Sequence, residues 1–299
     1  MSDYNSGGTK IIPLRLKISR GLDCNLLLQR FLPASKRENS TGSTIDSGRL
    51  RVMHILLTND DGIFAPGLAA IYKKLVKLGE VSVVAPAEGK SAASHSISLE
   101  PLMCDKVDLT GKFSGYSVSG SPADCVKLAV MKLTEQPIDL VVSGINHGAN
   151  VGVNVYYSGT VAAAMEAAFF SIPSLALSVA CEKDTDFDAA AEYGLGIMEK
   201  LLPLKAGSVI NINIPMLSKG APKGVKVVGQ SISGYHEHYT TGRNEHGQTV
   251  YQLGGGGHRD EKTASTDTTA LIEGFITVTA LHFDMTDHEE NRRLEEITW

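Results

Sequence analysis

The chain has 299 residues, of which 42% are hydrophobic and 20% are charged, as expected of a globular protein with one large domain or two modest ones. Its formal net charge of −5 is uneven: residues 1–52 carry nine Lys or Arg against four Asp or Glu, and the remainder carries 19 against 29. An acidic body argues against a surface for long nucleic acids, because binding their backbone needs many clustered cations. No apolar stretch approaches the roughly 20 residues of a membrane span. Four cysteines without metal-type spacing favour reduced, mostly buried thiols and a cytoplasmic location.

Residues 1–52 differ in composition from the rest of the chain. Ser- and Gly-rich ends surround one modest apolar patch at residues 26–32, and no hydrophobic periodicity is sustained, which predicts disorder for most of the segment. The basic bias would suit an organelle transit peptide, but the four acidic residues and the lack of a clear arginine face argue against one. We expect Met53, which precedes the first strong strand, to be the natural start, and residues 1–52 to be dispensable for folding and activity.

From residue 53 the chain alternates between short apolar runs and amphipathic segments. Strands are predicted at 54–57, 81–85, 138–142, 175–179 and 209–214, with helices between them at about 68–78, 123–134, 161–170 and 187–202. This repeated β-α-β spacing predicts a three-layer α/β/α fold with a mainly parallel, right-handed sheet. Residues 53–299 are predicted to form a single domain, with the α/β core at about 53–220.

The character of the sequence changes after Pro215. Residues 225–232 and 249–253 read as the two strands of a long hairpin, and residues 254–257 as a flexible glycine hinge. A last strand is predicted at 275–281 and a short terminal helix at 287–297. An arm of this kind, projecting from an α/β body, often packs on another subunit, so about 221–299 is expected to serve oligomerisation.

The most informative feature is a pair of adjacent carboxylates, Asp60 and Asp61, directly after the predicted strand 54–57. Gly62 then allows a sharp turn. Two like charges repel unless something positive lies beside them, and a divalent cation with oxygen ligands is the simplest neutraliser. Ligands of open α/β sheets bind at this end of the strands. The alternative is a solvated turn, in which the Asn-Asp-Asp-Gly run supplies turn chemistry and a helix cap.

Three further polar segments follow predicted strands and should converge on the same edge of the sheet. Segment 85–96 offers hydroxyls, segment 143–150 offers glycines and the neutral oxygen of Asn146, and segment 156–166 starts a helix whose free amides attract anions. Taken alone, each has an ordinary alternative: a Ser-rich loop, a turn with left-handed asparagines, and a plain helix N-cap.

Other chemistries lack their motifs. The chain has no P-loop lysine motif, no Gly-x-Gly-x-x-Gly fingerprint after the first strand and no Gly-x-Ser-x-Gly elbow. A phosphoaspartyl phosphatase would need Asp-x-Asp, whereas the two acids here are adjacent. A non-catalytic nucleotide-binding or assembly module is the other alternative, and a phosphate-release assay would separate it from an enzyme.

Several blocks, in order and with consistent spacing from Met53 to about residue 290, resemble the SurE survival-protein nucleotidases. The blocks are Asn-Asp-Asp-Gly at 59–62 with Ala-Pro-Gly at 65–67, Val-Ala-Pro at 84–86 followed by Ser91 and Ser94, Gly-Ser-Pro-Ala-Asp-Cys-Val at 120–126, Val-Ser-Gly-Ile-Asn at 142–146 with Gly148 and Asn150, and Tyr-Ser-Gly-Thr-Val-Ala-Ala-Ala-Met-Glu at 157–166. Together they are specific, whereas Asp-Asp-Gly alone would not be. Residues 1–52 have no counterpart.

The resemblance implies a Rossmann-like body with an exchanged C-terminal arm, in homodimers or homotetramers. It implies a phosphomonoesterase that acts on nucleoside 5′- and 3′-monophosphates with one Mg²⁺ or Mn²⁺ per subunit, and some members also shorten polyphosphate. Position by position, the implied metal ligands are Asp60, Asp61, Ser91 and Asn146. The implied phosphate-facing residues are Asn59, Ser94, Gly144, Ser158, Gly159 and Thr160.

For the reaction we expect in-line attack of water on phosphorus, without a covalent intermediate. The metal acts as Lewis acid, and the base is either Asp60 or a metal-activated water. Asp60, Asp61, Asn146 and Ser94 are the predicted catalytic residues, with Asn146, Ser94 and the amides at 158–160 stabilising the phosphoryl oxygens. Two positions depart from the family: His95, where many relatives have Asn, would alter phosphate contacts or protonation of the leaving group, and Ser121 replaces Thr but keeps the hydroxyl.

Overall fold

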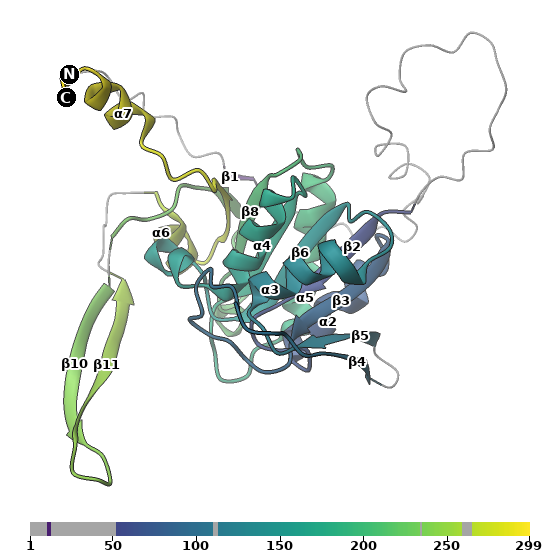
Figure 1. Ribbon diagram of the computed structural model, residues 1–299, viewed down its shortest axis with the longest axis horizontal. Coiled ribbons are helices and arrows are strands. Elements are labelled where there is room, and N and C mark those ends of the chain that lie inside the picture. Colours follow the sequence, from purple (N-terminus) through teal and green to yellow (C-terminus); the bar gives the residue numbers. More distant parts are fainter. Residues whose placement is uncertain (1–10, 13–51, 110–112, 234, 259–264) are drawn as a thin grey trace, which may run out of the picture.

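A single mixed sheet forms the centre of the protein (Figure 1). The computed structural model describes residues 11–12, 52–109, 113–233, 235–258 and 265–299. Within these ranges the sheet has ten strands, in the spatial order β1 (Ile11–Ile12), β9 (Val225–Val227), β12 (Ile276–Leu281), β8 (Val209–Ile214), β7 (Ser174–Val179), β6 (Leu140–His147), β2 (His54–Thr58), β3 (Glu80–Pro86), β5 (Phe113–Val118) and β4 (Cys104–Leu109). The run from β8 to β5 is parallel throughout, and β12 and β4 flank it antiparallel.

Helices cover both faces of this sheet. On one face lie α2 (Pro66–Leu75) and α5 (Phe187–Leu201), and on the other lie α3 (Pro122–Leu128), continued by the π-helix η3 (Ala129–Leu133), and α4 (Gly159–Phe169). Shorter elements are η4 (Gly152–Tyr156), η5 (Leu217–Lys219), α6 (Asp267–Ile272) and α7 (His288–Glu295). The prediction of a three-layer α/β/α fold with a mainly parallel sheet is confirmed.

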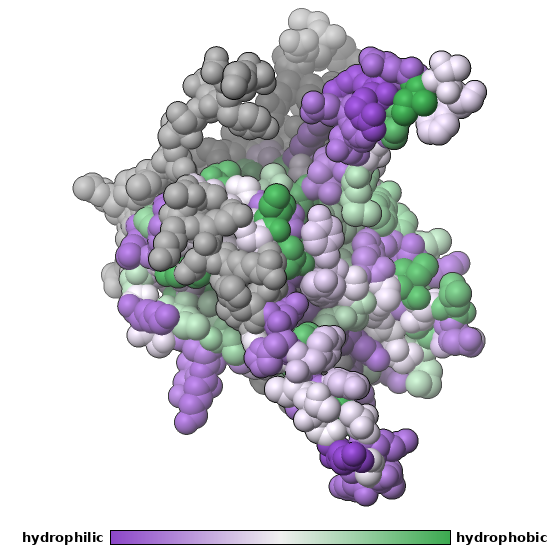
Figure 2. Space-filling model, turned by 90° about the vertical axis from the view of Figure 1, so that its left-hand side faces the viewer, coloured by the Kyte–Doolittle hydropathy of each residue, from purple (hydrophilic) through white to green (hydrophobic). Residues whose placement is uncertain are grey.

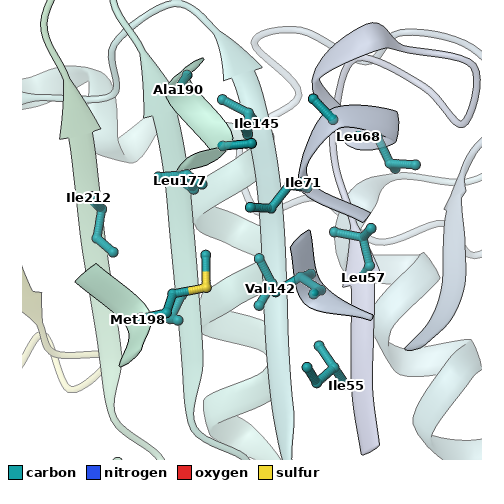
Figure 3. Close-up of a cluster of buried hydrophobic side chains, with 14 of the residues drawn as sticks. Ile55, Leu57, Leu68, Ile71, Val142, Ile145, Leu177, Ala190, Met198 and Ile212 are labelled. Atoms are coloured by element: carbon teal, nitrogen blue, oxygen red, sulfur yellow. The ribbon is translucent and has the colours of Figure 1, made fainter. Parts of the chain in front are cut away.

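The strand before the two carboxylates is buried at every position, because helices pack on both of its faces. Ile55 and Leu57 join the core between the sheet and helices α2 and α5, whereas Leu56 joins the core on the opposite face. Figure 3 shows the first of these cores, where Val142 of β6 and Leu68 of α2 lie beside them. Burying each such side chain contributes about 1.5–3 kcal/mol, so β2 is a rigid base for the residues that follow it.

The strand order reverses between β2 and β6. From β2 the chain continues to β3 on one side, and it later returns with β6 on the other side of β2. Ligands of open α/β sheets bind beyond the carboxyl ends of the strands at such a reversal. Asp60 and Asp61 directly follow β2, and Asn146 lies at the end of β6, so the fold brings two of the predicted segments to this point.

The predicted arm is present, and its second predicted strand, 249–253, lies in the hairpin, but its first strand was placed wrongly. The hairpin consists of β10 (Tyr235–Arg243) and β11 (Thr249–His258), which among the described strands pair only with each other and project from the body (Figure 1). Residues 225–227, expected in the hairpin, instead form β9 in the main sheet. The expected glycine hinge at 254–257 belongs to β11, because ladder hydrogen bonds use backbone groups and need no side chains. The surface of the arm is mostly polar (Figure 2).

The sequence also failed to predict β5 and its neighbour, the edge strand β4. Asp105, Lys106 and Asp108 make β4 too polar to read as a strand, yet charged side chains are what protects a sheet edge from further pairing. At the other edge, Ile11–Ile12 pair with β9. The rest of the predicted disorder at 1–52 falls almost entirely outside the described residues.

Two expectations from composition can be compared with the described part of the chain. No helix there is long and apolar enough to cross a bilayer. Of the free cysteines there, Cys125 is buried, Cys104 is half-buried and Cys181 is exposed, so the expectation of mostly buried thiols holds fully only for Cys125.

Candidate active site

The two adjacent carboxylates are held by different elements. Asp60 is 4% exposed, and its Oδ1 accepts a hydrogen bond from the Thr160 hydroxyl at 2.5 Å. Burial raises the pKa of Asp60 to about 6; the hydrogen bond from Thr160 opposes this rise and the charge of Asp61 adds to it. The Oδ2 of Asp61 accepts the backbone N–H of His147 at 3.1 Å. The start of α4 therefore holds one carboxylate, and the end of β6 holds the other.

Asn59 stabilises the same turn. Its side-chain Nδ2 donates to the Gly62 carbonyl at 2.9 Å, while its Oδ1 is buried and finds no donor among the described residues. Leaving a buried acceptor unpaired costs about 1–3 kcal/mol. An oxygen kept in this state next to two carboxylates indicates a site that a cation, a water or a ligand completes.

The Ser-rich loop after β3 lies against both the carboxylate turn and the residues before α4. The backbone N–H of Lys90 donates to the Asp60 carbonyl at 2.7 Å, which places Ser91 one residue beyond this contact. Further along, the Ser94 hydroxyl donates to the Tyr156 carbonyl at 2.7 Å, and the Ser94 N–H donates to the Tyr157 carbonyl at 3.1 Å. The structure therefore holds the backbone next to Ser91 against the turn of Asp60 and fixes Ser94 next to the start of α4.

Asn146 lies where β6 loses its regular pairing with β7, since the register shifts between Gly144 and Asn146. The Nδ2 of Asn146 donates to the Gly148 carbonyl at 2.7 Å, which leaves its Oδ1 available as a ligand. Gly144 has a φ of +140°, and a Cβ there would lie 2.2 Å from the Leu177 carbonyl oxygen. Packing of β6 against β7 thus accounts for this glycine, and its predicted phosphate contact stays a prediction.

The start of α4 approaches Asp60 closely because residue 159 has no side chain. A Cβ on Gly159 would lie 2.9 Å from the Asp60 Cβ and 3.2 Å from its Oδ2. Ser158 caps the helix by accepting the Val161 N–H at 3.1 Å, and the first turn contains no acidic residue. A helix N-terminus carries partial positive charge and attracts anions. The predicted anion site at 158–160 therefore lies directly beside the predicted metal ligands.

These residues fit a hard divalent cation. Asp60 and Asp61 offer carboxylates, Asn146 an amide oxygen and Ser91 a hydroxyl, all of the oxygen type that Mg²⁺ and Mn²⁺ prefer. The described residues contain no group of three or more His, Cys, Asp or Glu side chains that could hold a metal, so a zinc-type ligand set has no support there. The donor set and the unpaired Asn59 oxygen are consistent with one such ion.

Two side-chain contacts were not indicated by the sequence. The hydroxyl of Thr160 is bonded to Asp60, while the predicted phosphate contact of the Thr160 amide stays a prediction. His95 was expected to change phosphate contacts, but its Nε2 lies 2.9 Å from a carboxylate oxygen of Glu166, and its ring stacks on Phe169. The imidazole therefore faces the side of α4 in this structure. No sequence signal pairs two residues 71 positions apart, so only the fold reveals this contact.

Comparison with known proteins identifies the family of the chain. The family model described as "Survival protein SurE" matches residues 55–237. A protein named 5′-nucleotidase SurE from Rhodopirellula baltica is 44% identical over 238 residues, covering 78% of this chain and 94% of that protein. Its namesake from Syntrophobacter fumaroxidans is 42% identical over 240 residues, covering 79% and 96%. The crystal structure of the SurE protein from Aquifex aeolicus has a TM-score of 0.69 and 36% identity, covering 81% of this chain and 100% of that one. The chain belongs to the SurE family.

Proposed function

We propose that this protein is a metal-dependent phosphomonoesterase that hydrolyses nucleoside 5′-monophosphates, and also 3′-monophosphates, to nucleoside and phosphate. The prediction of a 5′-nucleotidase is confirmed by family membership and by relatives of that name at 42–44% identity. The observation that supports the chemistry is the junction of Asp60 with the start of α4. There, an anion-attracting helix end meets two carboxylates that a cation would neutralise.

In this proposal Asp60, Asp61, Ser91 and Asn146 hold one Mg²⁺ or Mn²⁺. When bound, the ion supplies Lewis acidity toward the phosphoryl oxygens and lowers the pKa of water. Residues of the chain orient the two carboxylates. The Thr160 hydroxyl fixes the orientation of the Asp60 carboxylate, and the N–H of His147 fixes that of Asp61. Both acids are thus oriented before a substrate arrives, which is what makes such groups effective.

The start of α4 receives the phosphate in this proposal. Its positive end and the backbone at Ser158 and Gly159 favour a dianion. The Ser94 hydroxyl is engaged with the Tyr156 carbonyl, so a direct contact of Ser94 with phosphate requires this hydroxyl to turn. Water attacks phosphorus on the side opposite the leaving nucleoside oxygen, the ester bond between phosphorus and that oxygen breaks, and one proton of the water ends on the nucleoside oxygen; no phosphoenzyme forms.

Oligomerisation and polyphosphate cleavage are further parts of the proposal. The hairpin arm exposes Tyr239, Tyr251 and Leu253, with 67%, 68% and 54% of their surfaces accessible. An arm with exposed aromatic and aliphatic side chains is typical of a subunit contact, so we propose a homodimer or homotetramer in which the arms are exchanged. Light scattering of the purified protein measures this directly, and a monomer would contradict it. Shortening of polyphosphate is proposed as a secondary activity at the same site.

The decisive experiment is phosphate release from a panel of nucleoside 5′- and 3′-monophosphates and polyphosphate. We expect EDTA to abolish turnover and Mg²⁺ or Mn²⁺ to restore it. Turnover that resists the chelator would reject the metal assignment, and a trapped phosphoenzyme would instead support a phosphoaspartyl mechanism. Nucleotide binding without any phosphate release would support a binding module.

A further inference from the structure

Asp267 is a buried carboxylate outside the proposed catalytic residues that joins two segments far apart in sequence. It is the first residue of α6 and has no exposed surface. Its Oδ2 accepts the backbone N–H of Gly152 at 2.9 Å. Its Oδ1 accepts the N–H groups of Ser231 at 2.9 Å and Thr268 at 2.7 Å. Three backbone donors from three places therefore converge on both oxygens of one side chain.

The Gly152 contact leads to the proposed phosphate site. Gly152 begins the 3₁₀ turn η4, which ends at Tyr156. The carbonyls of Tyr156 and the next residue accept both hydrogen bonds from Ser94, and Ser158 then caps α4. Only six residues of chain thus separate the Asp267 contact from the helix start, so a shift of Gly152 would be transmitted to both Ser94 and the cap.

The Ser231 contact leads to the hairpin arm. Ser231 is 3% exposed and lies four residues before β10, where the chain leaves the body for the arm (Figure 1). The neighbouring Gln230 donates its side-chain amide to the Gly152 carbonyl at 2.8 Å. Both the N–H and the carbonyl of Gly152 are therefore bonded to this region, one through Asp267 and the other through Gln230.

A second anchor holds the same loop from the sheet. The Asn150 N–H donates to the Asn213 side chain at 2.7 Å, and the Asn150 amide donates to the Ser178 hydroxyl at 2.9 Å. Residues 147–157, between the predicted ligand Asn146 and the helix cap, are thus fixed from β7, β8 and α6. Of these three links, the one through Asp267 connects the loop to Ser231, where the chain enters the arm.

We propose that Asp267 is a positioning residue for hydrolysis of the phosphomonoester. It holds the Gly152–Tyr156 turn against the start of the arm at Ser231, and through this turn it positions Ser94 and the start of α4. This inference rests on the proposed function. A carboxylate is needed because N–H donors approach both oxygens. An amide of the same size offers an acceptor on one side only and presents an NH₂ group to a donor on the other.

Asp267→Asn tests this role with little change in volume. Misplacement of a reacting group by about 1 Å can cost about 10²-fold in rate, so we expect kcat/KM for p-nitrophenyl phosphate to fall by about 10- to 100-fold. The inhibition constant of inorganic phosphate should rise about fivefold, equivalent to about one hydrogen bond lost between phosphate and the displaced start of α4. The matched control is Asp139→Asn, because Asp139 accepts the His54 N–H at 2.8 Å at the opposite end of β2. The control should lower the melting temperature and leave both constants unchanged.

Asp267→Asn with lower stability but unchanged kinetic constants, measured where the variant is folded, would overturn the proposal. If this variant does not fold, Gln230→Met removes the second link to Gly152 and should weaken phosphate binding in the same direction; unchanged constants there would also overturn it. An inactive wild type would reject the proposed function instead. Calorimetric binding of inorganic phosphate by wild type and variants would then still decide the inference, with equal affinities overturning it.

Discussion

Two neighbouring helices, α3 and α4, start at the same edge of the sheet behind a serine cap, yet their first turns differ. In α3 the Ser121 hydroxyl accepts the Asp124 N–H at 3.0 Å, and the Asp124 carboxylate accepts the Ser121 N–H at 2.8 Å. This reciprocal capping box places a negative charge at the positive end of the helix. In α4, Ser158 caps alone and no acidic residue follows in the first turn.

The difference shows how one helix start is closed and the other stays open. Asp124 neutralises the end of α3 and also binds the N–H and the hydroxyl of Ser98, so this end serves structure. In α4 Gly159 follows the cap, and the start of the helix lies against the Asp60 carboxylate. Unlike α3, α4 has no acidic residue in its own first turn. The distinction can be read in the sequence, as Ser-x-x-Asp at 121–124 against Ser-Gly-Thr-Val at 158–161.

The largest effect is expected from the carboxylates beside α4. Asp60→Asn and Asp61→Asn should each lower kcat/KM by at least about 10²–10³-fold with folding retained, because each removes a charge on which metal binding and transition-state stabilisation depend. Asp124→Asn at α3 should lower the stability by about 1 kcal/mol. Its loss of kcat/KM should be at least about ten times smaller than that of Asp60→Asn or Asp61→Asn. Steady-state kinetics and circular dichroism measure both effects. Near-wild-type turnover without either Asp60 or Asp61 would remove the basis of the site assignment.

Replacing the glycine after the cap is the next test. Gly159→Ala puts a methyl group 2.9 Å from the Asp60 Cβ, so either α4 or the carboxylate must move. We expect kcat/KM to fall by about 10²-fold. Gly196→Ala in α5 is the control, because a Cβ there has nothing within 4 Å. It should stabilise the protein by about 0.5–1 kcal/mol in urea unfolding without changing the rate. Equal kinetics for the two variants would show that the close approach has no role in catalysis.

The sequence predicted the parts of the molecule that depend on local pattern. Largely apolar runs such as 54–57 and 175–179 became central strands, because a strand covered on both faces buries the side chains of both faces. The Asp60–Asp61 turn and the helix start at 158–160 lie together because parallel strands bring their carboxyl ends to one edge. The fold class followed from the same regularity.

The parts that failed depend on contacts between distant residues or on backbone pairing. The strand β4 is polar, and the glycines of β11 carry no side-chain signal, so neither shows the alternation that marks a half-buried strand. Thr160 and Asp60 lie 100 positions apart, and Gly152 and Asp267 lie 115 apart. A single sequence gives no pattern for such pairs.

Replacing either of the two capping serines by alanine is expected to have a smaller effect on phosphate binding and stability. Ser158→Ala and Ser121→Ala each remove an acceptor for a first-turn N–H, and each should cost about 1 kcal/mol of stability. Only Ser158→Ala should also raise the inhibition constant of inorganic phosphate, by a few-fold, because only that helix end faces the proposed phosphate. Urea unfolding and inhibition kinetics on both variants test this. An equal rise for Ser121→Ala would mean that α3 is open to anions as well.

The smallest effect on catalysis is expected where the two helices are joined. Lys127 of α3 lies 2.8 Å from a Glu166 oxygen in α4, and His95 lies 2.9 Å from the other. Burial alone would raise the pKa of Glu166, but the hydrogen bonds from His95 and Lys127 and the charges of these residues lower it below 4.5. A carboxyl with a lowered folded-state pKa stabilises the fold above about pH 4.5 and loses this contribution as the pH falls through its folded value.

Glu166→Gln should therefore be less stable than wild type by about 1–3 kcal/mol at neutral pH, as for lost hydrogen bonds to a buried charged group. The difference should shrink as the pH is lowered below about 4.5, where the wild-type carboxyl becomes protonated as well. Because this joint holds the sides of α3 and α4 and not the start of α4, kcat/KM at neutral pH should change by less than about twofold. Urea unfolding of both proteins across the acidic range provides the comparison. A stability difference that stays constant with pH would mean that the contact stabilises the protein through packing and not through the charge of Glu166.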